Sequence, residues 1–252
     1  MGQEVNWSPI PPSMDFDREF GFCPELARLY ASEFALGADG SRFALGGCST
    51  PNNLAALKRL FERTRPRRTL EIGLCLGASG LLFTALHRHS KAAPERQHVA
   101  IDPFQSSTWK RAGLMAIERA GLAQYLDFRE DLSCLELPRL VGADARFGMI
   151  YIDGSHLFED VMVDAYFSMR LLADDGLMIF DDSADPHVQK VLRFIRANAG
   201  EAVEEIDLGA YRATEHATLR YRLARTFGKV QLTAFRRVGR ADRAWNAPFH
   251  SF

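Results

Sequence analysis

Residues 146–182 read RFGMIYIDGSHLFEDVMVDAYFSMRLLADDGLMIFDD. This run contains two short apolar segments, at 147–153 and 177–181, which are typical of buried strands. Between them, apolar residues recur at the spacing of an amphipathic helix over 157–173. A strand, a helix and a second strand in this order predict two parallel strands in one sheet.

Polar side chains stand where these two strands end. Asp153 closes the first strand, and His156 follows three residues later. Asp181 and Asp182 close the second. Because the carboxyl ends of parallel strands meet at one edge of a sheet, the four side chains are expected close together, where open α/β sheets bind ligands.

The alternation of strands and helices extends over most of the chain. The other predicted strands are 69–73, 98–102 and 126–130, and the other helices are 78–89, 107–120 and 186–198. Such alternation predicts an α/β fold with a parallel sheet covered by helices on both faces. Two further predicted strands, within 201–207 and 228–238, lie close together in the sequence and predict an antiparallel end to the sheet.

Three units are predicted along the chain. Residues 1–50 are expected to form a polar, proline-rich arm followed by helices that contact substrate or a second copy of the chain. Residues 51–238 form the central domain, and residues 239–252 form a loose tail. Within the first unit, a helical pattern over 24–36 is expected to end at Gly37.

Composition excludes several classes of function. The 252-residue chain has a formal net charge of −1, which gives no support to nucleic-acid binding or to an anionic membrane surface as partner. Its four cysteines are scattered without a CxxC pair, which favours reduced thiols. The first residues lack the pattern of a signal peptide, and no apolar run approaches the roughly 20 residues that span a bilayer. A soluble, cytoplasmic protein is therefore expected.

A glycine-rich loop, EIGLCLGASG, follows the first strand of the central domain. Gly73 and Gly77 allow a sharp turn and a close approach to a ligand, and the following helix offers free N–H groups at its start. The loop departs from the dinucleotide fingerprint G-x-G-x-x-G, because Cys75 takes the place of the second glycine. The carboxylate of Glu71, just before the turn, would repel a pyrophosphate but suits a cationic ligand.

Two more acids follow the next strands. Asp102 ends the second strand and is placed to accept hydrogen bonds from both hydroxyls of a ribose. Asp131 follows the third strand and could hold an adenine amino group. The alternatives are a turn cap at Asp102, which precedes a proline, and a solvated Asp131.

The motif E-x-G-x-x-x-G-x-S at 71–79, the acid after the second strand, and the IDGSH and LLADDGLMIFDD blocks resemble the class I S-adenosylmethionine-dependent methyltransferases. The IDGSH…DD pattern is similar to the branch of macrocin-type sugar O-methyltransferases, and more distantly to catechol O-methyltransferase. The resemblance covers about residues 50–238. It implies a Rossmann-like, doubly wound, seven-stranded and mostly parallel sheet, in the order 3-2-1-4-5-7-6, with an N-terminal helical extension.

The resemblance also implies where S-adenosyl-L-methionine would bind. The glycine loop would lie beside the cofactor, with its amino-acid end near Glu71 and Ser79; Ser79 could equally be a helix cap. Asp102 would hold the ribose, and Asp131 with Leu132 would flank the adenine. The residues implied in cofactor binding are Glu71, Gly73, Gly77, Ser79, Asp102, Asp131, Leu132 and Asp153.

Asp153, Asp181 and Asp182 could supply the oxygen ligands that Mg²⁺ prefers. Without a cation, three clustered carboxylates would raise one another's pKa values. A substrate with two adjacent hydroxyls could chelate the ion. His156, with an ordinary pKa of about 6.5, suits a general base, and with Asp153 it forms the predicted catalytic pair. Local capping by the aspartates and a structural histidine are the alternatives.

The predicted reaction is O-methylation of a small hydroxylated molecule, either a sugar or natural product or a vicinal diol. A nicotinamide-dependent oxidoreductase on a related sheet and a non-catalytic S-adenosylmethionine-binding module are the alternatives. The arm and the tail offer surface that two copies could exchange, which makes a homodimer a reasonable expectation. His87 and Asp164 are interpreted as solvated residues on helices.

Overall fold

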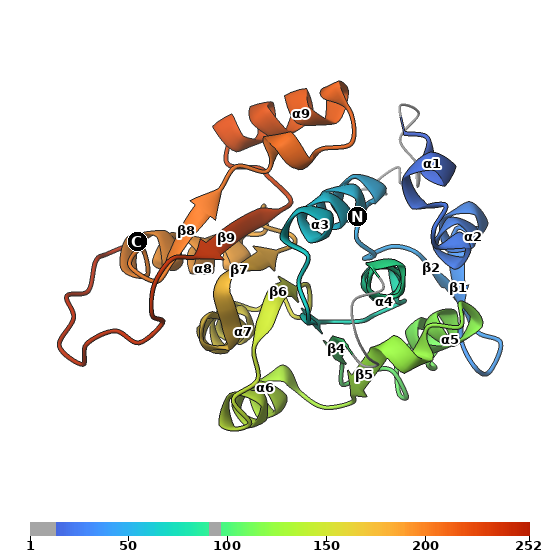
Figure 1. Cartoon of the computed structure of the whole chain (residues 1–252), viewed down its shortest axis with the longest axis horizontal. Helices are drawn as coiled ribbons and strands as arrows, with labels where there is room; N and C mark the ends of the chain where they lie inside the picture. Colours follow the sequence, from blue (N-terminus) through green and yellow to red (C-terminus); the bar gives the residue numbers. More distant parts are fainter. Residues whose placement is uncertain (1–13, 91–96) are drawn as a thin grey trace, which may run out of the picture.

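The structure is a computed structural model that describes residues 14–90 and 97–252, so most of the predicted N-terminal arm lies outside the described residues (Figure 1). The strands of its main sheet are β3 (Thr69–Ile72), β4 (His98–Ile101), β5 (Leu126–Arg129), β6 (Phe147–Ile152), β7 (Leu172–Phe180), β8 (Val203–Ile206) and β9 (Thr233–Arg237). The helices that pack against this sheet are α3 (Pro51–Thr64), α4 (Ala78–Ser90), α5 (Ala112–Arg119), α6 (Ser133–Gly142), α7 (Phe158–Leu171) and α8 (Pro186–Asn198).

The seven strands lie in the order β5-β4-β3-β6-β7-β9-β8. Strands β5, β4, β3, β6 and β7 are parallel, whereas β9 is antiparallel to both β7 and β8. Numbered within the sheet, this is the predicted order 3-2-1-4-5-7-6, and the predicted antiparallel end is also confirmed. The Rossmann-like α/β fold class is therefore confirmed.

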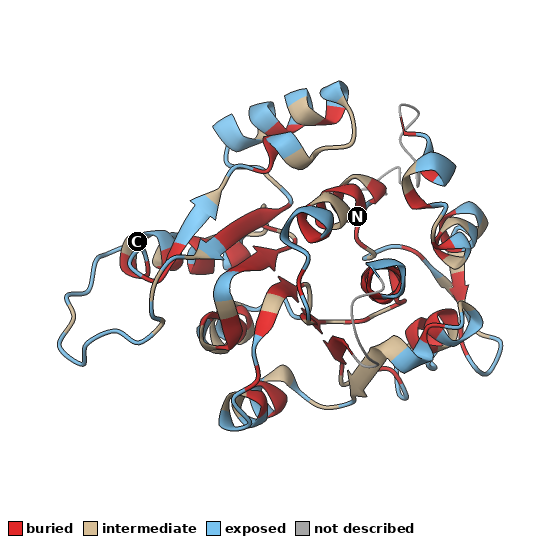
Figure 2. Ribbon diagram, in the orientation of Figure 1, coloured by how far each residue is buried: buried red, intermediate tan, exposed pale blue. Residues whose placement is uncertain are grey.

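Each face of the sheet has its own hydrophobic core, because successive strand residues point to opposite sides. Met149 and Tyr151 pack with α3, α4 and α5, whereas Ile150 and Ile152 pack with α6, α7 and α8. Figure 1 shows these two helical layers on either side of the sheet. The central strands are buried throughout, whereas α9 (Glu215–Thr226) and the tail after β9 are mostly exposed (Figure 2).

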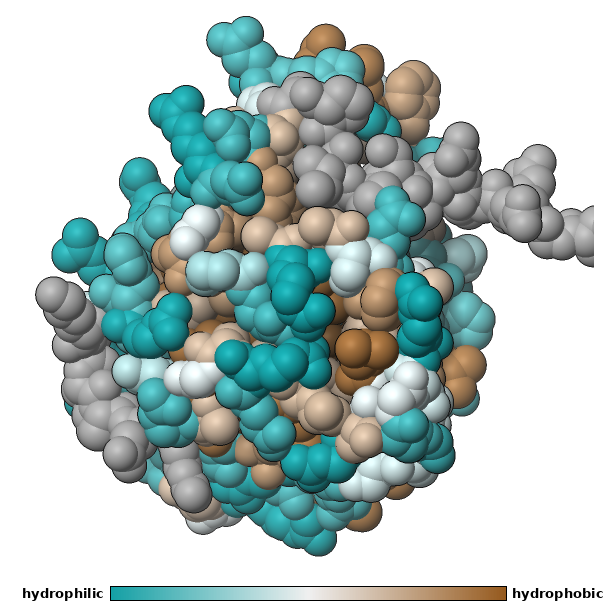
Figure 3. All heavy atoms as spheres, turned by 90° about the vertical axis from the view of Figure 1, so that its right-hand side faces the viewer, coloured by the Kyte–Doolittle hydropathy of each residue, from teal (hydrophilic) through white to brown (hydrophobic). Residues whose placement is uncertain are grey.

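The N-terminal segment forms α1 (Phe16–Phe20), α2 (Pro24–Ser32) and a two-stranded hairpin of β1 (Phe34–Leu36) and β2 (Arg42–Ala44). The predicted extension of the helix to Gly37 is wrong, because Glu33 takes the left-handed conformation with φ 60° and ends the helix four residues earlier. Phe20 and Leu26 share one core with α4, so this segment packs as part of the central domain. Hydrophilic side chains surround smaller hydrophobic areas on this side of the molecule (Figure 3).

Other element boundaries differ for identifiable reasons. Helix α6 was not expected, because Pro138 lies inside it and proline disfavours helix interiors. Helix α5 begins only at Ala112, after Lys110 and Arg111 in left-handed conformations. All four cysteines are free, as expected. Within the described ranges, no helix combines the length and the apolar character that crossing a membrane requires.

Two polar residues expected in solvent are buried instead. The side chain of His87 is 2% exposed and that of Asp164 is 1% exposed. Burial raises the pKa of Asp164 to about 7, and the nearby Ser133, at the start of α6, opposes that rise. His87 belongs to a buried hydrogen-bond chain described below. Helical periodicity alone did not separate these two residues from the solvated face.

Candidate active site

The register of the sheet brings the predicted site residues into one row. Ile72 pairs with Ile101 and with Ile152, and Ile152 pairs with Phe180. The residues that follow these four positions therefore end the four strands at the same level; they are Gly73, Asp102, Asp153 and Asp181. The predicted meeting of carboxylates at one edge of the sheet is confirmed for Asp153, Asp181 and Asp182.

The two glycines of the loop are required by the backbone. Gly73 has φ +92°, and a Cβ there would lie 2.2 Å from the backbone oxygen of Asp153. Gly77 has φ +86°, and a Cβ there would lie 2.8 Å from Gly113. Cys75 is also left-handed, with φ 46°. Glycine adopts this conformation without the steric cost of a side chain, so both positions favour glycine whatever ligand the loop holds.

Asp102 is 2% exposed and holds the glycine loop. Its Oδ2 accepts hydrogen bonds from the backbone N–H groups of Leu74, at 3.1 Å, and Cys75, at 2.7 Å. Its Oδ1 accepts from the N–H of Phe104 at 2.7 Å, so part of the expected capping role is present. The contact of Asp102 with a ribose stays a prediction. A ribose hydroxyl would have to donate to carboxylate oxygens of Asp102 that already accept hydrogen bonds from the backbone.

Glu71 is fully buried, and both of its carboxylate oxygens have partners. The hydroxyl of Ser79 donates to Oε1, and Nε2 of His98 lies 2.8 Å from Oε2. Glu71, on β3, therefore links the start of α4 and β4 through its hydrogen bonds with Ser79 and His98. Direct contact of Glu71 and Ser79 with the cofactor's amino-acid end stays a prediction.

The hydrogen bonds continue from His98 across the core. The hydroxyl of Thr69 lies 2.8 Å from Nδ1 of His98 and 2.9 Å from Nε2 of His87. Burial lowers the pKa of His87 to about 3, so this imidazole is neutral. A neutral histidine has one donor and one acceptor nitrogen, so the chain can run in one direction and end on the Glu71 carboxylate. The order of the glycine loop thus depends on residues that motif reading does not single out.

The predicted site residues that follow β5 lie at the surface. Asp131 accepts a hydrogen bond from the N–H of Leu132 at 2.8 Å and pairs with Arg139 at 2.9 Å. The Arg139 hydrogen bond lowers the pKa of Asp131. The side chain of Leu132 is 49% exposed and is available to a flat apolar ligand. Their position beside an adenine stays a prediction.

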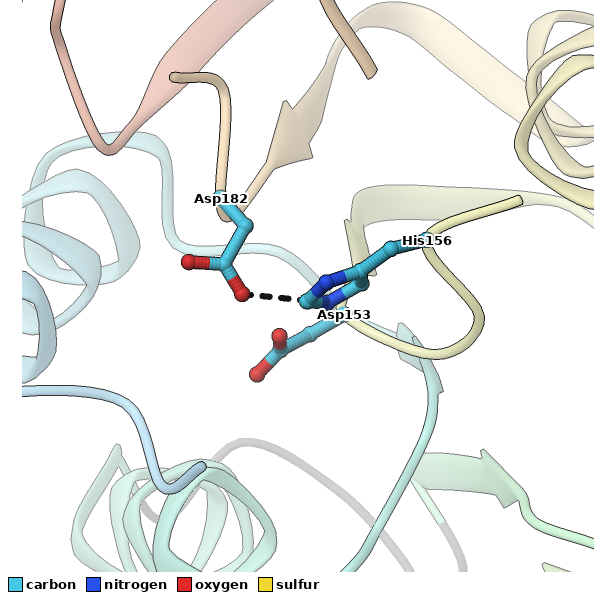
Figure 4. A group of neighbouring side chains, drawn as sticks. All are labelled: Asp153, His156 and Asp182. Atoms are coloured by element: carbon cyan, nitrogen blue, oxygen red, sulfur yellow. Dashed lines mark ion pairs between the residues drawn. The ribbon is translucent and has the colours of Figure 1, made fainter. Parts of the chain in front are cut away.

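Asp153, His156 and Asp182 form one group at the ends of β6 and β7 (Figure 4). One ligand atom of each lies within 4.8 Å of the others, which is close enough to hold a metal ion. Nε2 of His156 lies 3.0 Å from Oδ2 of Asp182. This hydrogen bond raises the pKa of His156 above its ordinary value. The group contains two of the three predicted metal ligands and the predicted base.

Asp181, the third predicted ligand, lies in an adjoining buried network. Its carboxylate accepts hydrogen bonds from the hydroxyl of Tyr151 and from Nδ2 of Asn53, the latter at 3.0 Å. The N–H of Asp182 donates to it at 2.8 Å. Asp181 does not belong to the group that can hold an ion. Its role as a metal ligand stays a prediction, and a metal bound to its carboxylate would have to replace some of these hydrogen bonds.

Sequence reasoning missed the residues that position the acids. The hydroxyl of Ser49 lies 2.7 Å from that of Tyr151 and donates to Oδ2 of Asp153 at 3.2 Å. Tyr151 could have been found, because it precedes Asp153 by two residues and so points to the same face of the strand. The sequence did not indicate that Ser49 and Asn53 contact the site, because each lies more than about a hundred residues before the acid to which it hydrogen-bonds.

Burial and mutual repulsion control the electrostatics of the acids. Burial, followed by the charges of Asp181 and Asp182, raises the pKa of Asp153 well above its ordinary value. Burial raises the pKa of Asp181 to about 6. Both shifts express the cost of holding negative charge away from water, and a bound cation would offset that cost.

Residues 70–183 match the family model described as a methyltransferase domain. This segment is therefore similar to methyltransferase domains. It begins at β3 and ends just after Asp182, so it contains the glycine loop and the whole acid group. The predicted enzyme class, an S-adenosylmethionine-dependent methyltransferase, is confirmed by this match. No curated protein matches the sequence significantly.

Solved structures share the fold of this methyltransferase. One is the O-methyltransferase from Bacillus cereus in complex with SAH, with 21% identity over 74% of this chain and 82% of that chain, and a TM-score of 0.54. Another is TomG from Streptomyces achromogenes, an O-methyltransferase of tomaymycin synthesis in complex with SAM, with 19% identity over 90% of this chain and all of that chain, and a TM-score of 0.56. At these identities the likeness shows the fold alone.

Proposed function

We propose that the protein transfers a methyl group from S-adenosyl-L-methionine to a hydroxyl of a small molecule, with help from a divalent cation. The observation that supports this most is the edge of the sheet, where the glycine loop, Asp102 and the acid group end on neighbouring strands. In this proposal the cofactor binds at that edge, beside a group that can hold a cation and accept a proton. The O-methyltransferases with this fold support the choice of oxygen as acceptor.

The donor set at the acid group fits a cation. Asp153 and Asp182 offer carboxylate oxygens, which Mg²⁺ prefers, and Asp181 is the predicted third ligand. When bound, the cation would lower the pKa of an acceptor hydroxyl, and the cofactor would supply an already reactive methyl group. The residues that hold both reactants in place supply the orientation, which in well-ordered systems removes about 7–11 kcal/mol of barrier.

His156 is the residue that can take the hydroxyl proton. Its Nε2 is engaged by Asp182, which leaves Nδ1 as the nitrogen that can accept a proton. The side chain is exposed enough to meet a substrate. The hydrogen bond to Asp182 also stabilises the imidazolium that forms when the proton arrives, as a carboxylate does in other His-dependent sites.

A transfer assay with methyl-labelled cofactor tests the proposal. The purified protein should move label to at least one member of a panel of catechols and sugars and release S-adenosylhomocysteine in equal amount. Reduction of NAD by an alcohol, without transfer of label, would favour the oxidoreductase instead. Binding of the cofactor without transfer to any hydroxyl would favour the non-catalytic module.

Removal of the cation should suppress transfer by at least about 100-fold, because a cation at the reacting oxygen supplies several kcal/mol. The measurement is the initial rate after dialysis against EDTA, then after addition of Mg²⁺ or Mn²⁺. Restoration by the added ion is the expected result. A rate that EDTA leaves unchanged contradicts the cation and leaves His156 as the means of activation.

The rate should rise with pH, because only the neutral form of His156 accepts a proton. In the protein without cation, the hydrogen bond to Asp182 raises the pKa of His156 above its ordinary value of about 6.5. Asp182→Asn removes the charge and should lower that pKa. NMR titration of the His156 imidazole without cation checks this; a pKa that stays in place or moves upward in Asp182→Asn contradicts it.

We infer three further properties from the sequence alone. The substrate is a sugar, natural product or vicinal diol; the enzyme works in the cytoplasm; and it forms a homodimer through its arm and tail. These stay predictions. Sedimentation of the purified chain tests the last of them, and the transfer panel above tests the first.

A further inference from the structure

A cavity of about 670 Å³ opens on the side of the acid group that faces the N-terminal segment. Its lining includes residues 44–50, Asn53, Gln231 and Glu33. The acids Asp153, Asp181 and Asp182 complete the lining, and Ser49 and Asn53 hydrogen-bond to two of them. None of the glycine-loop residues lines this cavity, so it lies on the acceptor side of the proposed reaction.

The lining carries negative charge without a balancing cation. Its charged residues are Glu33 and the three aspartates, and it contains no lysine, arginine or histidine. A bound divalent cation would still leave a formal charge of −2. Two cationic side chains lie nearby but outside the lining: Arg212, whose guanidinium is 3.4 Å from Oδ1 of Asn53, and His156, whose Nε2 is 3.0 Å from Oδ2 of Asp182. A cavity of one charge sign attracts ligands of the opposite sign and excludes those of like sign.

Glu33 also lines the cavity, and its side chain is paired with no other residue in the part of the chain that the structure describes. It ends α2, it is exposed, and none of the ion pairs among the described residues involves it. A carboxylate that lines a cavity and pairs with nothing in the protein can serve a ligand.

The rest of the lining selects against flat rings. No aromatic residue is among the lining residues. They combine the hydroxyl and amide groups of Ser49, Thr50, Asn53 and Gln231 with the small or aliphatic residues Ala44, Leu45, Gly46, Gly47 and Cys48. Aromatic ligands are commonly held by apolar and aromatic walls, whereas hydroxyl and amide side chains suit a molecule with several hydroxyls. The chemistry of this cavity therefore matches an aliphatic polyol better than a catechol.

From these observations we propose that the acceptor is an aliphatic polyol that carries a protonated amine, and that Glu33 is the residue that selects for the positive charge. This rests on the proposed function, because it assigns the cavity to the acceptor. Glu33 and residues 44–53 lie outside the matched domain at 70–183. Selectivity for the acceptor would then come from the N-terminal segment, and transfer chemistry from the domain.

Three sugars that differ in charge test the proposal: glucosamine, glucose and glucuronate. Their affinities are measured by NMR saturation transfer on the full chain with S-adenosylhomocysteine and Mg²⁺. We expect glucosamine to bind most tightly and glucuronate most weakly. Glu33→Gln should weaken glucosamine by about twofold to fivefold, the range for a solvent-exposed ion pair, and leave glucose unchanged.

Asp144→Asn is the matched control, because Asp144 is also an exposed acid in a left-handed conformation, but it precedes β6 at the opposite edge of the sheet. It should change none of the three affinities. Equal binding of the three sugars, no binding by any of them, or an unchanged glucosamine affinity in Glu33→Gln would overturn the inference. S-adenosylhomocysteine binding, measured alone, reports separately on the proposed function.

Discussion

Gly73→Ala is expected to destabilise the protein and abolish cofactor binding. The new Cβ would lie 2.2 Å from the backbone oxygen of Asp153, and the residue would have to keep φ +92°. Backbone strain and overpacking each cost about 1–3 kcal/mol, so the free energy of unfolding should fall by roughly 2–6 kcal/mol. Relief of the clash would separate β3 from β6 at the edge where the cofactor is proposed to bind. Urea denaturation and titration with S-adenosylhomocysteine measure the two effects.

Gly142→Ala is the control for this substitution. Gly142 ends α6 without a positive φ, and a Cβ there would meet no described atom within 4 Å apart from its chain neighbours and the backbone of its own helix. Alanine favours helix over glycine by up to about 1 kcal/mol, so this variant should be as stable as the parent or slightly more so. A Gly73→Ala variant that keeps its stability and its affinity would show that the edge of the sheet is not packed as described.

The second large effect is expected for His156→Gln, which should lower kcat by about 10²–10⁴-fold, the usual contribution of a general base. Glutamine keeps a side chain that can hydrogen-bond to Asp182 but cannot accept the proton. Because His156 is half-exposed, the stability and the affinity for S-adenosylhomocysteine should not change. The remaining rate should lose the rise with pH described above.

His216→Gln provides the comparison, since His216 is an exposed histidine on α9. It should leave kcat unchanged. The cation affinity of His156→Gln, measured with Mn²⁺ by electron paramagnetic resonance, separates two roles. If His156 is only a base, this affinity is retained; if the imidazole is a ligand, the affinity falls together with kcat. A full kcat in His156→Gln would leave the site without its proposed base.

Much of the fold was predictable because the local pattern and the long-range packing agree. Strands such as β6 and β7 are buried on both faces, so they read as continuous apolar runs, and the helix between them forces a parallel pairing. Once the strands are parallel and in register, the polar residues that follow them must share an edge. The row from Gly73 to Asp181 follows from this reasoning alone.

The wrong predictions concern positions where a single residue departs from the pattern of the surrounding sequence. The pattern over 24–36 is helical throughout, but the left-handed Glu33 divides it into a helix and a strand. Pro138 argues against a helix that nevertheless forms. His87 was expected in solvent because it flanks Arg88 at a helix end, where cationic side chains are favourable. It is buried instead, and Thr69 of β3 supplies the hydrogen-bond partner that its burial requires.

The sequence predicted the acids of the candidate site but not the residues that hydrogen-bond to them. Motif spacing indicates which residues end the strands, and it carries no information about Ser49 and Asn53, which arrive from another part of the chain. It also does not distinguish Asp181 from Asp182, which are adjacent in sequence. The structure separates them, because Asp181 turns toward Tyr151 and Asp182 turns toward His156.

Calorimetric titration of the purified chain with S-adenosylhomocysteine, and separately with NAD, tests the central claim most directly. The claim is that the edge formed by β3, β4 and β6 binds an S-adenosyl cofactor. It predicts one-to-one binding of S-adenosylhomocysteine and no heat from NAD, because Glu71 and Cys75 depart from a pyrophosphate-binding loop. Tight binding of NAD with no binding of S-adenosylhomocysteine would contradict it.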